Sequence, residues 1–178
     1  EAFARRLQDG DQVALVTFAT DAIVTNTLTG NVAGVANAIK SLTIDPEEET
    51  GSTNTGDAIL RGAEELTSAR HNTEARKVMV LLTDGLATAP DEEPEDYARV
   101  AASQAKAEDI NLFTIGLGQN VNMDFVRELA SSPGQAYQAV SAGQVDSIYR
   151  GITAEICEDG AAIIEIIPKT DAGFFELR

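Results

Sequence analysis

Two short segments of the sequence carry oxygen-bearing side chains at positions that suit a metal site. Thr53 lies just before a predicted long helix, with further hydroxyl groups at Ser52 and Thr55, and Asp84 follows the most apolar predicted strand. A hard cation such as Mg²⁺ takes hydroxyl, carboxylate and water oxygens in octahedral geometry. The residue types therefore indicate a divalent-cation site with Thr53 and Asp84 as ligands, and with Ser52 and Thr55 as candidates for its outer shell.

Each segment also has a purely structural interpretation. Thr53 or Thr55 can cap the helix, since a threonine hydroxyl accepts a hydrogen bond from a backbone amide of the first turn. Asp84-Gly85 can form an ordinary turn. Taken singly, each segment favours the structural interpretation, so the metal site depends on the two segments lying side by side.

The pattern of apolar residues predicts the elements that position these segments. Strands are predicted at 13–18, 22–28, 77–82, 110–116 and 136–140, and helices at 31–42, around 58–66 and 98–105, around 125–129 and at 144–156. The strand at 22–28 is the most polar and suits a sheet edge. Alternating strands and helices predict an α/β fold: a doubly wound, mostly parallel, Rossmann-like sheet flanked by helices. Ligands bind such sheets beyond the carboxyl ends of the strands, where Thr53 and Asp84 fall.

The end of the chain departs from this alternation. Residues 161–168 and 173–177 read as two strands in succession with no helix between them. We therefore expect residues 1–157 to form one domain. Residues 158–178 would be a short β extension at the C-terminus, the start of a following β module, or a strand that pairs with another chain.

The composition excludes several classes of partner. The net charge of −16 over 178 residues opposes any approach to the phosphates of nucleic acids or to anionic lipid headgroups. No stretch reaches the roughly 18 apolar residues needed to span a bilayer, so no membrane insertion is expected in this segment. Cys157 is the only cysteine, which excludes an internal disulfide framework.

Four segments occur in the order and spacing of von Willebrand factor A-type domains, and the chain resembles this family over most of its length. They are residues 10–18, 51–55, 80–85 and 112–118. The resemblance implies recognition of a protein ligand through a metal-ion-dependent adhesion site, where a carboxylate of the ligand completes the cation's shell. It implies that Thr53 is the hydroxyl ligand of the second loop. Asp84 would be the acidic residue of the third loop, touching the metal directly or through water.

One part of the family pattern is missing from this chain. The family's first loop carries Asp-x-Ser-x-Ser at the end of a central strand, and no such pattern occurs in these 178 residues. Residues 1–7 resemble the end of the helix that follows that strand, so we expect a fragment, or a cleavage product, whose first strand is missing or on a separate polypeptide. Mg²⁺, or Mn²⁺ or Ca²⁺, is therefore expected only if the missing loop is present in the full protein.

A sheet without its central strand leaves two neighbouring strands with unpaired backbone groups, which is costly in a buried sheet. An upstream segment on another chain can fill this position, and we favour it because strand complementation between chains is well founded physically. The alternative is the tail strand 161–167, from this chain or from a neighbouring copy. In some secreted family members a disulfide ties the two ends of the domain, so Cys157 would pair with missing upstream sequence. The alternative is a buried or inert thiol.

The expected function is a protein-recognition or adhesion module of an extracellular or cell-surface assembly, such as a pilus or fibre. The alternative is a metal-free structural assembly domain, a scaffold subunit that borrows a strand. An enzyme is not expected: Gly116-Leu117-Gly118 lacks the third glycine of a dinucleotide fingerprint, and no Gly-x-Ser-x-Gly elbow occurs. His71, the only histidine, and the acidic clusters 45–49 and 91–96 are expected on the solvated surface.

Overall fold

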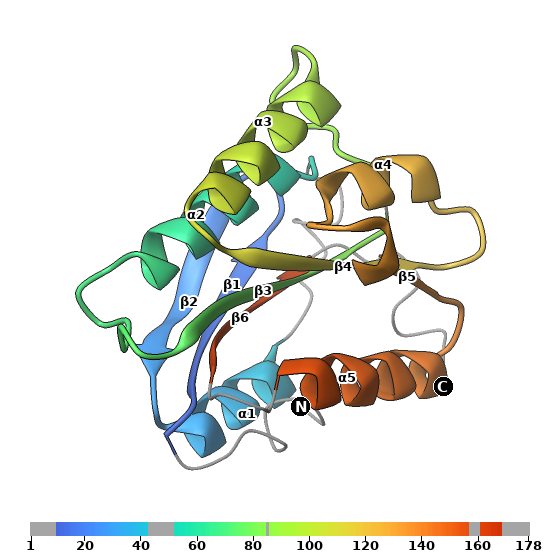
Figure 1. Cartoon of the computed structure of the whole chain (residues 1–178). Helices are drawn as coiled ribbons and strands as arrows, with labels where there is room; N and C mark the ends of the chain where they lie inside the picture. The colour runs from blue at the N-terminus through green and yellow to red at the C-terminus, as the bar shows by residue number, and fades with distance from the viewer. Residues whose placement is uncertain (1–9, 43–51, 85, 157–160, 169–178) are drawn as a thin grey trace.

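The computed structural model of the protein describes residues 10–42, 52–84, 86–156 and 161–168. Its strands are β1 (Gln12–Phe18), β2 (Ala22–Thr29), β3 (Arg76–Thr83), β4 (Asn111–Leu117), β5 (Ala136–Ala139) and β6 (Ala161–Pro168). Its α-helices are α1 (Val32–Ser41), α2 (Thr55–Leu66), α3 (Pro94–Ala107), α4 (Met123–Leu129) and α5 (Ala142–Ile156), and a 3-10 helix, η2 (Pro133–Gln135), precedes β5. The strands form one sheet in the order β2-β1-β6-β3-β4-β5, parallel except for the β1–β2 pair (Figure 1). The predicted α/β class is confirmed.

Helices cover both faces of the sheet. Helices α2, α3 and α4 lie on one face, and α1 and α5 lie on the other (Figure 1). Successive side chains of a strand point to opposite faces, which explains why the parallel strands are apolar throughout. In β3, for example, Met79 and Leu81 join the core under α2 and α3, whereas Val80 joins the core under α5. The two layers hold the carboxyl ends of the strands at one edge of the molecule.

The central position of the sheet is filled by β6 of the same chain. Its backbone pairs in parallel with β1 on one side and with β3 on the other. The sequence offered this tail strand as the alternative occupant of the central position. A strand from another chain, which we favoured, is not what the structure shows. The central position of β6 also differs from the expectation that this segment extends away from the domain. The physical reason is the one that made a filler necessary: β1 and β3 each have a row of backbone groups that only a further strand can pair.

The edge position of β2 is confirmed, and α2 protects the backbone of this strand. The amide of Ala22 donates to Oδ2 of Asp57 at 3.1 Å, and the amide of Leu28 donates to Oε2 of Glu65 at 3.0 Å. Glu65 is buried and is also held by Arg70, whose guanidinium lies 2.6 Å from Oε1. Two carboxylates of one helix therefore satisfy backbone donors of the edge strand, which blunts the edge against pairing with other strands.

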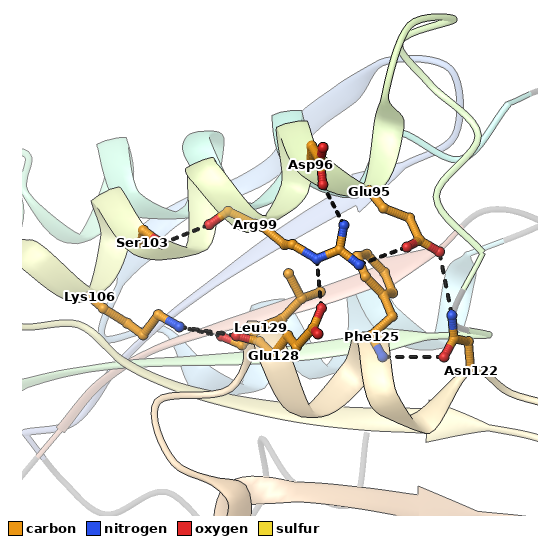
Figure 2. Close-up of polar contacts among 9 residues, drawn as sticks. All are labelled: Glu95, Asp96, Arg99, Ser103, Lys106, Asn122, Phe125, Glu128 and Leu129. Carbon is orange, nitrogen blue, oxygen red and sulfur yellow. Dashed lines mark hydrogen bonds and ion pairs between the residues drawn. The ribbon is translucent and has the colours of Figure 1, made fainter.

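Helices α3 and α4 are joined by two long basic side chains of α3 (Figure 2). The Arg99 guanidinium contacts Glu95 and Asp96 in its own helix and Glu128 in α4, and it lies 5.5 Å from the centre of the Phe125 ring. The ammonium of Lys106 donates to three carbonyls at the end of α4, those of residues 128–130. A cation at this place satisfies free carbonyls and opposes the negative end of the helix dipole. This clamp fixes α4 and the loop before it, which runs along the carboxyl edge of the sheet.

Several sequence expectations lie outside the described residues. They concern residues 1–7, the acidic cluster 45–49, Gly85, Cys157 and the second tail strand at 173–177. Within the described ranges, no helix combines the length and the apolar character needed to cross a membrane.

Candidate functional site

Thr53 lies in the turn that leads into α2, at the carboxyl edge of the sheet. Its exposed fraction is 7%, and its backbone makes three hydrogen bonds to the loop that follows β3. The amide of Thr53 donates to Oγ1 of Thr88 at 2.7 Å, and its carbonyl accepts from the amides of Thr88 and Ala89. Within the part of the chain that the structure describes, the hydroxyl of Thr53 makes no hydrogen bond. The backbone of Thr53 is thus fixed while its side-chain oxygen is available to a ligand.

Asp84 directly follows β3, whose last six residues are buried, and is partly exposed. One of its carboxylate oxygens, Oδ1, accepts a 3.3 Å hydrogen bond from the amide of Leu86. The loop that begins at Asp84 is therefore the same loop that holds Thr53 through Thr88. The structure brings the two predicted ligand segments to one edge of the sheet and ties them together, although neither sequence segment alone required it.

The start of α2 is also tied to the end of β1. The amide of Asn54 donates to the carbonyl of Ala19 at 2.8 Å, and the amide of Ser52 donates to Oγ1 of Thr20 at 3.1 Å. The helix cap is Asn54, whose side chain accepts from the amide of Asp57 at 3.0 Å. The suggestion that Thr53 or Thr55 caps this helix is therefore wrong. The cap needs a side chain three residues before the accepted amide, and in this helix register Asn54 holds that place.

Thr55 is completely buried at the first position of α2, and its hydroxyl oxygen has no hydrogen-bond partner among the described residues. Ser52 is partly exposed beside it. A buried hydroxyl without a partner is unfavourable in a folded protein, because it has given up its hydrogen bonds to water. The start of α2 therefore contains a polar group that an additional polar ligand or water would satisfy.

The carboxyl edge of the sheet is acidic. Its described loops are residues 19–21, 52–54, 84, 86–93, 118–122 and 140–141, and none of these residues is a lysine or arginine. They contain Asp21, Asp84, Asp91, Glu92 and Glu93. Summed negative charge over such an edge raises the local concentration of cations and lowers that of anions. The field at this edge suits a cation.

Two donors do not make a complete metal shell. Among the described residues no group of three or more histidine, cysteine, aspartate or glutamate side chains is placed to hold a metal ion. Thr53 and Asp84 can supply a hydroxyl and a carboxylate, whereas Mg²⁺ prefers six oxygen ligands and gives up its water reluctantly. In the second acidic cluster, Glu95 and Asp96 already contact Arg99, and Asp91 and Glu92 are exposed.

His71 differs from the expectation of a solvated residue. It is only partly exposed, and its Nε2 atom is buried with no partner among the described residues. Burial, together with the nearby charge of Lys77, lowers the pKa of His71 from its ordinary value. The loop 67–75 folds back on itself through backbone hydrogen bonds such as that from the His71 amide to the carbonyl of Ser68. The loop lies at the amino edge of the sheet, away from Thr53 and Asp84.

Sequence reasoning missed Thr20 and Thr88, the two hydroxyl residues that join the loops of this site. Each acts on a backbone amide more than thirty residues away in the sequence, at separations of 32 and 35 residues. Neither residue lies in a periodic pattern or in a motif. Only the fold brings them to their partners, so no local signal was present to find them.

The fold recurs in solved structures of proteins from distant sources. The conserved hypothetical protein BatB from Bacteroides thetaiotaomicron matches with a TM-score of 0.70 and 17% identity, over 88% of this chain and 84% of that one. Proximal thread matrix protein 1 from the mussel byssus matches with a TM-score of 0.69 and 25% identity, over 87% of this chain and 38% of that one. The pilus adhesin SpaC from Lactobacillus rhamnosus GG matches with a TM-score of 0.66 and 15% identity, over 86% of this chain and 26% of that one.

A comparison of the sequence with curated proteins finds no match. The family model for the von Willebrand factor type A domain, however, matches residues 1–151. This match covers the segments that hold Thr53 and Asp84 and all described strands except β6. The chain belongs to the von Willebrand factor A-type domain family.

Proposed function

We propose that this domain is a non-enzymatic protein-recognition module that binds its partner through a divalent cation at the carboxyl edge of the sheet. Thr53 and Asp84 would hold the cation, and the partner would present a carboxylate to it. The remaining protein ligands would come from a segment outside residues 1–178, because no Asp-x-Ser-x-Ser pattern occurs in this sequence.

The observation that carries this proposal is the link between the two ligand segments. Two backbone–backbone hydrogen bonds and one from the Thr53 amide to the Thr88 hydroxyl join Thr53 to the loop that begins at Asp84. A hydroxyl without a hydrogen bond among the described residues and a partly exposed carboxylate therefore share one edge. The unpartnered hydroxyl of Thr55 and the absence of basic residues from the described edge loops add to the fit. When bound, a divalent cation supplies positive charge that attracts a carboxylate which the acidic edge alone would repel.

Two of the proteins with similar structures support the same interpretation. One is a pilus adhesin, and the mussel byssus protein has a crystal form with a zinc-occupied MIDAS motif, the metal-ion-dependent adhesion site. A pilus and a byssus are both assemblies outside the cell or at its surface. We propose an extracellular or cell-surface location for this domain too, within a larger assembly such as a pilus or fibre.

A second candidate function is a structural assembly domain that keeps the fold without the metal. Two observations favour it: β6 already fills the central position of the sheet, and Thr53 and Asp84 are too few to hold Mg²⁺ against its hydration shell. In this case the carboxyl edge would have no role in recognition, and the domain would act through its shape.

Titration calorimetry with Mg²⁺ and Mn²⁺ separates the two functions. We expect the 178-residue chain to bind either ion negligibly, and the full-length natural protein to bind with an affinity that Asp84→Ala abolishes and Thr53→Ala weakens. Asp91→Ala, which removes an exposed acid of the same edge, is the matched control and should leave the affinity nearly unchanged. Micromolar affinity in the 178-residue chain would contradict the need for outside ligands. No binding by the full-length protein would favour the structural function.

A further inference from the structure

Exposed carboxylates lie on both sides of the candidate ligand Thr53. On one side is the loop 19–21, which is tied to the start of α2 by hydrogen bonds from the backbone amides of Asn54 and Ser52. The last residue of this loop, Asp21, is exposed. One acidic side chain is therefore held beside Thr53 from the end of β1.

The other side is formed by the loop 86–93. The amide of Thr88 donates to the carbonyl of Thr53 at 3.0 Å, and the ring of Tyr97, in the first turn of α3, lies against Gly56. The chain between these two contacts is thus held close to the start of α2. It contains three exposed acidic residues in succession, Asp91, Glu92 and Glu93.

These four carboxylates have no ion-pair partner among the described residues. Exposed acids on the helices, by contrast, are paired with arginines of the same helix, as in Glu64–Arg61 and Asp124–Arg127. The described loops of the carboxyl edge contain no lysine or arginine that could do the same. With Asp84 they carry five acidic residues, and a divalent cation would offset only two of these charges. The described edge would therefore stay negative after a cation binds.

An independent observation points to a ligand at the same place. The segment 53–55 lies between the two groups of acids and holds two threonine hydroxyls without a hydrogen bond among the described residues. Thr55 is completely buried, and the exposed fraction of Thr53 is 7%. Buried hydroxyls without partners are unfavourable. The acids therefore flank a point whose polar groups a bound ligand would satisfy.

We propose that the partner segment recognised at this edge presents its carboxylate between lysine or arginine side chains. This inference rests on the proposed function, because the cation is what holds the partner's carboxylate. Charges interact over about 8 Å at physiological ionic strength, so the neighbours of that carboxylate would meet Asp21 and the acids at 91–93. Basic neighbours are attracted there, and acidic neighbours are repelled. The cation thus favours a carboxylate, and the unpaired acids of the edge determine which residues surround it.

A peptide display library tests this proposal. Peptides with one fixed aspartate and randomised residues on both sides are selected on the full-length natural protein in Mg²⁺ and eluted with EDTA, so that only cation-dependent peptides are recovered. We expect lysine and arginine to be enriched by about two- to fivefold over the unselected library at the randomised positions, the range that an exposed ion pair gives.

Two neutralised variants separate the charge of this edge from the net charge of the domain. The test variant removes three charges beside the site and is Asp91→Asn/Glu92→Gln/Glu93→Gln. The matched control removes three exposed charges at the amino edge and is Glu74→Gln/Glu108→Gln/Glu155→Gln. The enrichment of lysine and arginine should be lost with the test variant and kept with the control.

Several outcomes would overturn the proposal. They are cation-dependent peptides without the enrichment, an equal loss of enrichment in both variants, and basic peptides that bind as well in EDTA as in Mg²⁺. Calorimetry on the same full-length protein distinguishes this failure from that of the proposed function. If the protein binds Mg²⁺ but selects no basic, cation-dependent peptides, the present inference alone is wrong. If it binds no Mg²⁺, the proposed function is wrong and this inference fails with it.

Discussion

The phenol of Tyr149 in α5 donates a 2.6 Å hydrogen bond to Oε1 of Glu165, which lies on β6 in the middle of the sheet. Both side chains are buried, so the bond joins the central strand to the helix that covers it. It is also the only hydrogen bond of the Glu165 carboxyl among the described residues, because Oε2 has no partner. The protonation state of this carboxyl group should therefore affect the stability of the central strand.

Stability should fall as the pH rises because of Glu165. Burial raises the pKa of its carboxyl above the ordinary value of 4.5, although the hydrogen bond from Tyr149 acts in the opposite direction. The contribution of the protonated group is therefore fully present below the unfolded-state pKa and is lost as the pH rises through the folded-state pKa. Glu165→Gln cannot ionise, so its stability relative to wild type should increase as the pH rises through and above the ordinary carboxyl range. Urea unfolding across this range checks the difference, and parallel curves for the two proteins would contradict it.

Removal of the Tyr149 hydroxyl should destabilise the protein. In Tyr149→Phe both oxygens of the Glu165 carboxyl are buried without a partner, which should cost about 1–3 kcal/mol. The control is the same substitution in a Glu165→Val background, where there is no carboxyl to satisfy. There the buried phenol has lost its Glu165 acceptor, so removing its hydroxyl should be neutral or stabilising. Chemical denaturation of the four proteins gives the coupling energy. A coupling energy near zero would mean that the bond contributes nothing to stability.

The strands of the sheet could be predicted, but the position of β6 could not. The run at 77–82 is apolar throughout, which is typical of a strand buried on both faces, and the polar strand at 22–28 indicated an edge. The run at 161–167 indicated a buried strand equally well. The apolar character of a strand, however, indicates that the strand is buried. It does not indicate which strands it pairs with. That choice depends on two open edges, β1 and β3, which lie far away in the sequence.

The places of the two candidate ligand segments in the fold could be predicted, but the residues that support them could not. Thr53 stands out because it lies in a run of polar residues just before a predicted helix. Asp84 stands out because it follows the most apolar predicted strand. The cap of α2 falls in a run of three polar residues, 53–55, any of which has a suitable side chain, and only the helix register selects Asn54. The hydrogen bond from Thr53 to Thr88 spans 35 residues, so it exists only after the sheet has formed.

Gly56 should be intolerant of a side chain because the Tyr97 ring lies against it. A Cβ atom at this position would meet Cδ1 of Tyr97 at 2.3 Å, which is far too close. Gly56→Ala should therefore cost about 1–3 kcal/mol through overpacking between α2 and α3. In a Tyr97→Ala background the clash is gone, and the same substitution should stabilise α2 by up to about 1 kcal/mol, the helix preference of alanine over glycine. The sign of the effect in the two backgrounds, measured by urea unfolding, decides whether the ring contact is the cause.

The buried carboxylate of Glu65 should protect the edge strand β2. In Glu65→Ala the amide of Leu28 loses its acceptor, which should cost about 1–3 kcal/mol and increase hydrogen exchange at that amide. Arg70→Ala is the matched control, because it removes the ion-pair partner and leaves the acceptor in place. Arg70→Ala also destabilises the protein, because the buried carboxylate loses its ion-pair partner, but it should leave hydrogen exchange at Leu28 nearly unchanged. Unchanged exchange at Leu28 in Glu65→Ala would show that β2 needs no protection from α2.

Thr88→Val should loosen Thr53 from the loop that carries Asp84. Valine keeps the shape of threonine but lacks the oxygen that accepts from the Thr53 amide at 2.7 Å. The loss of this bond should cost about 1 kcal/mol and should raise hydrogen exchange at the Thr53 amide. Thr88→Ser keeps the hydroxyl and should preserve the protection. If the proposed cation site is correct, Thr88→Val should also weaken divalent-cation binding by the full-length natural protein, because one of the three hydrogen bonds that join the two ligand segments is lost. Full protection of Thr53 in Thr88→Val would mean that this hydrogen bond does not hold the two loops together.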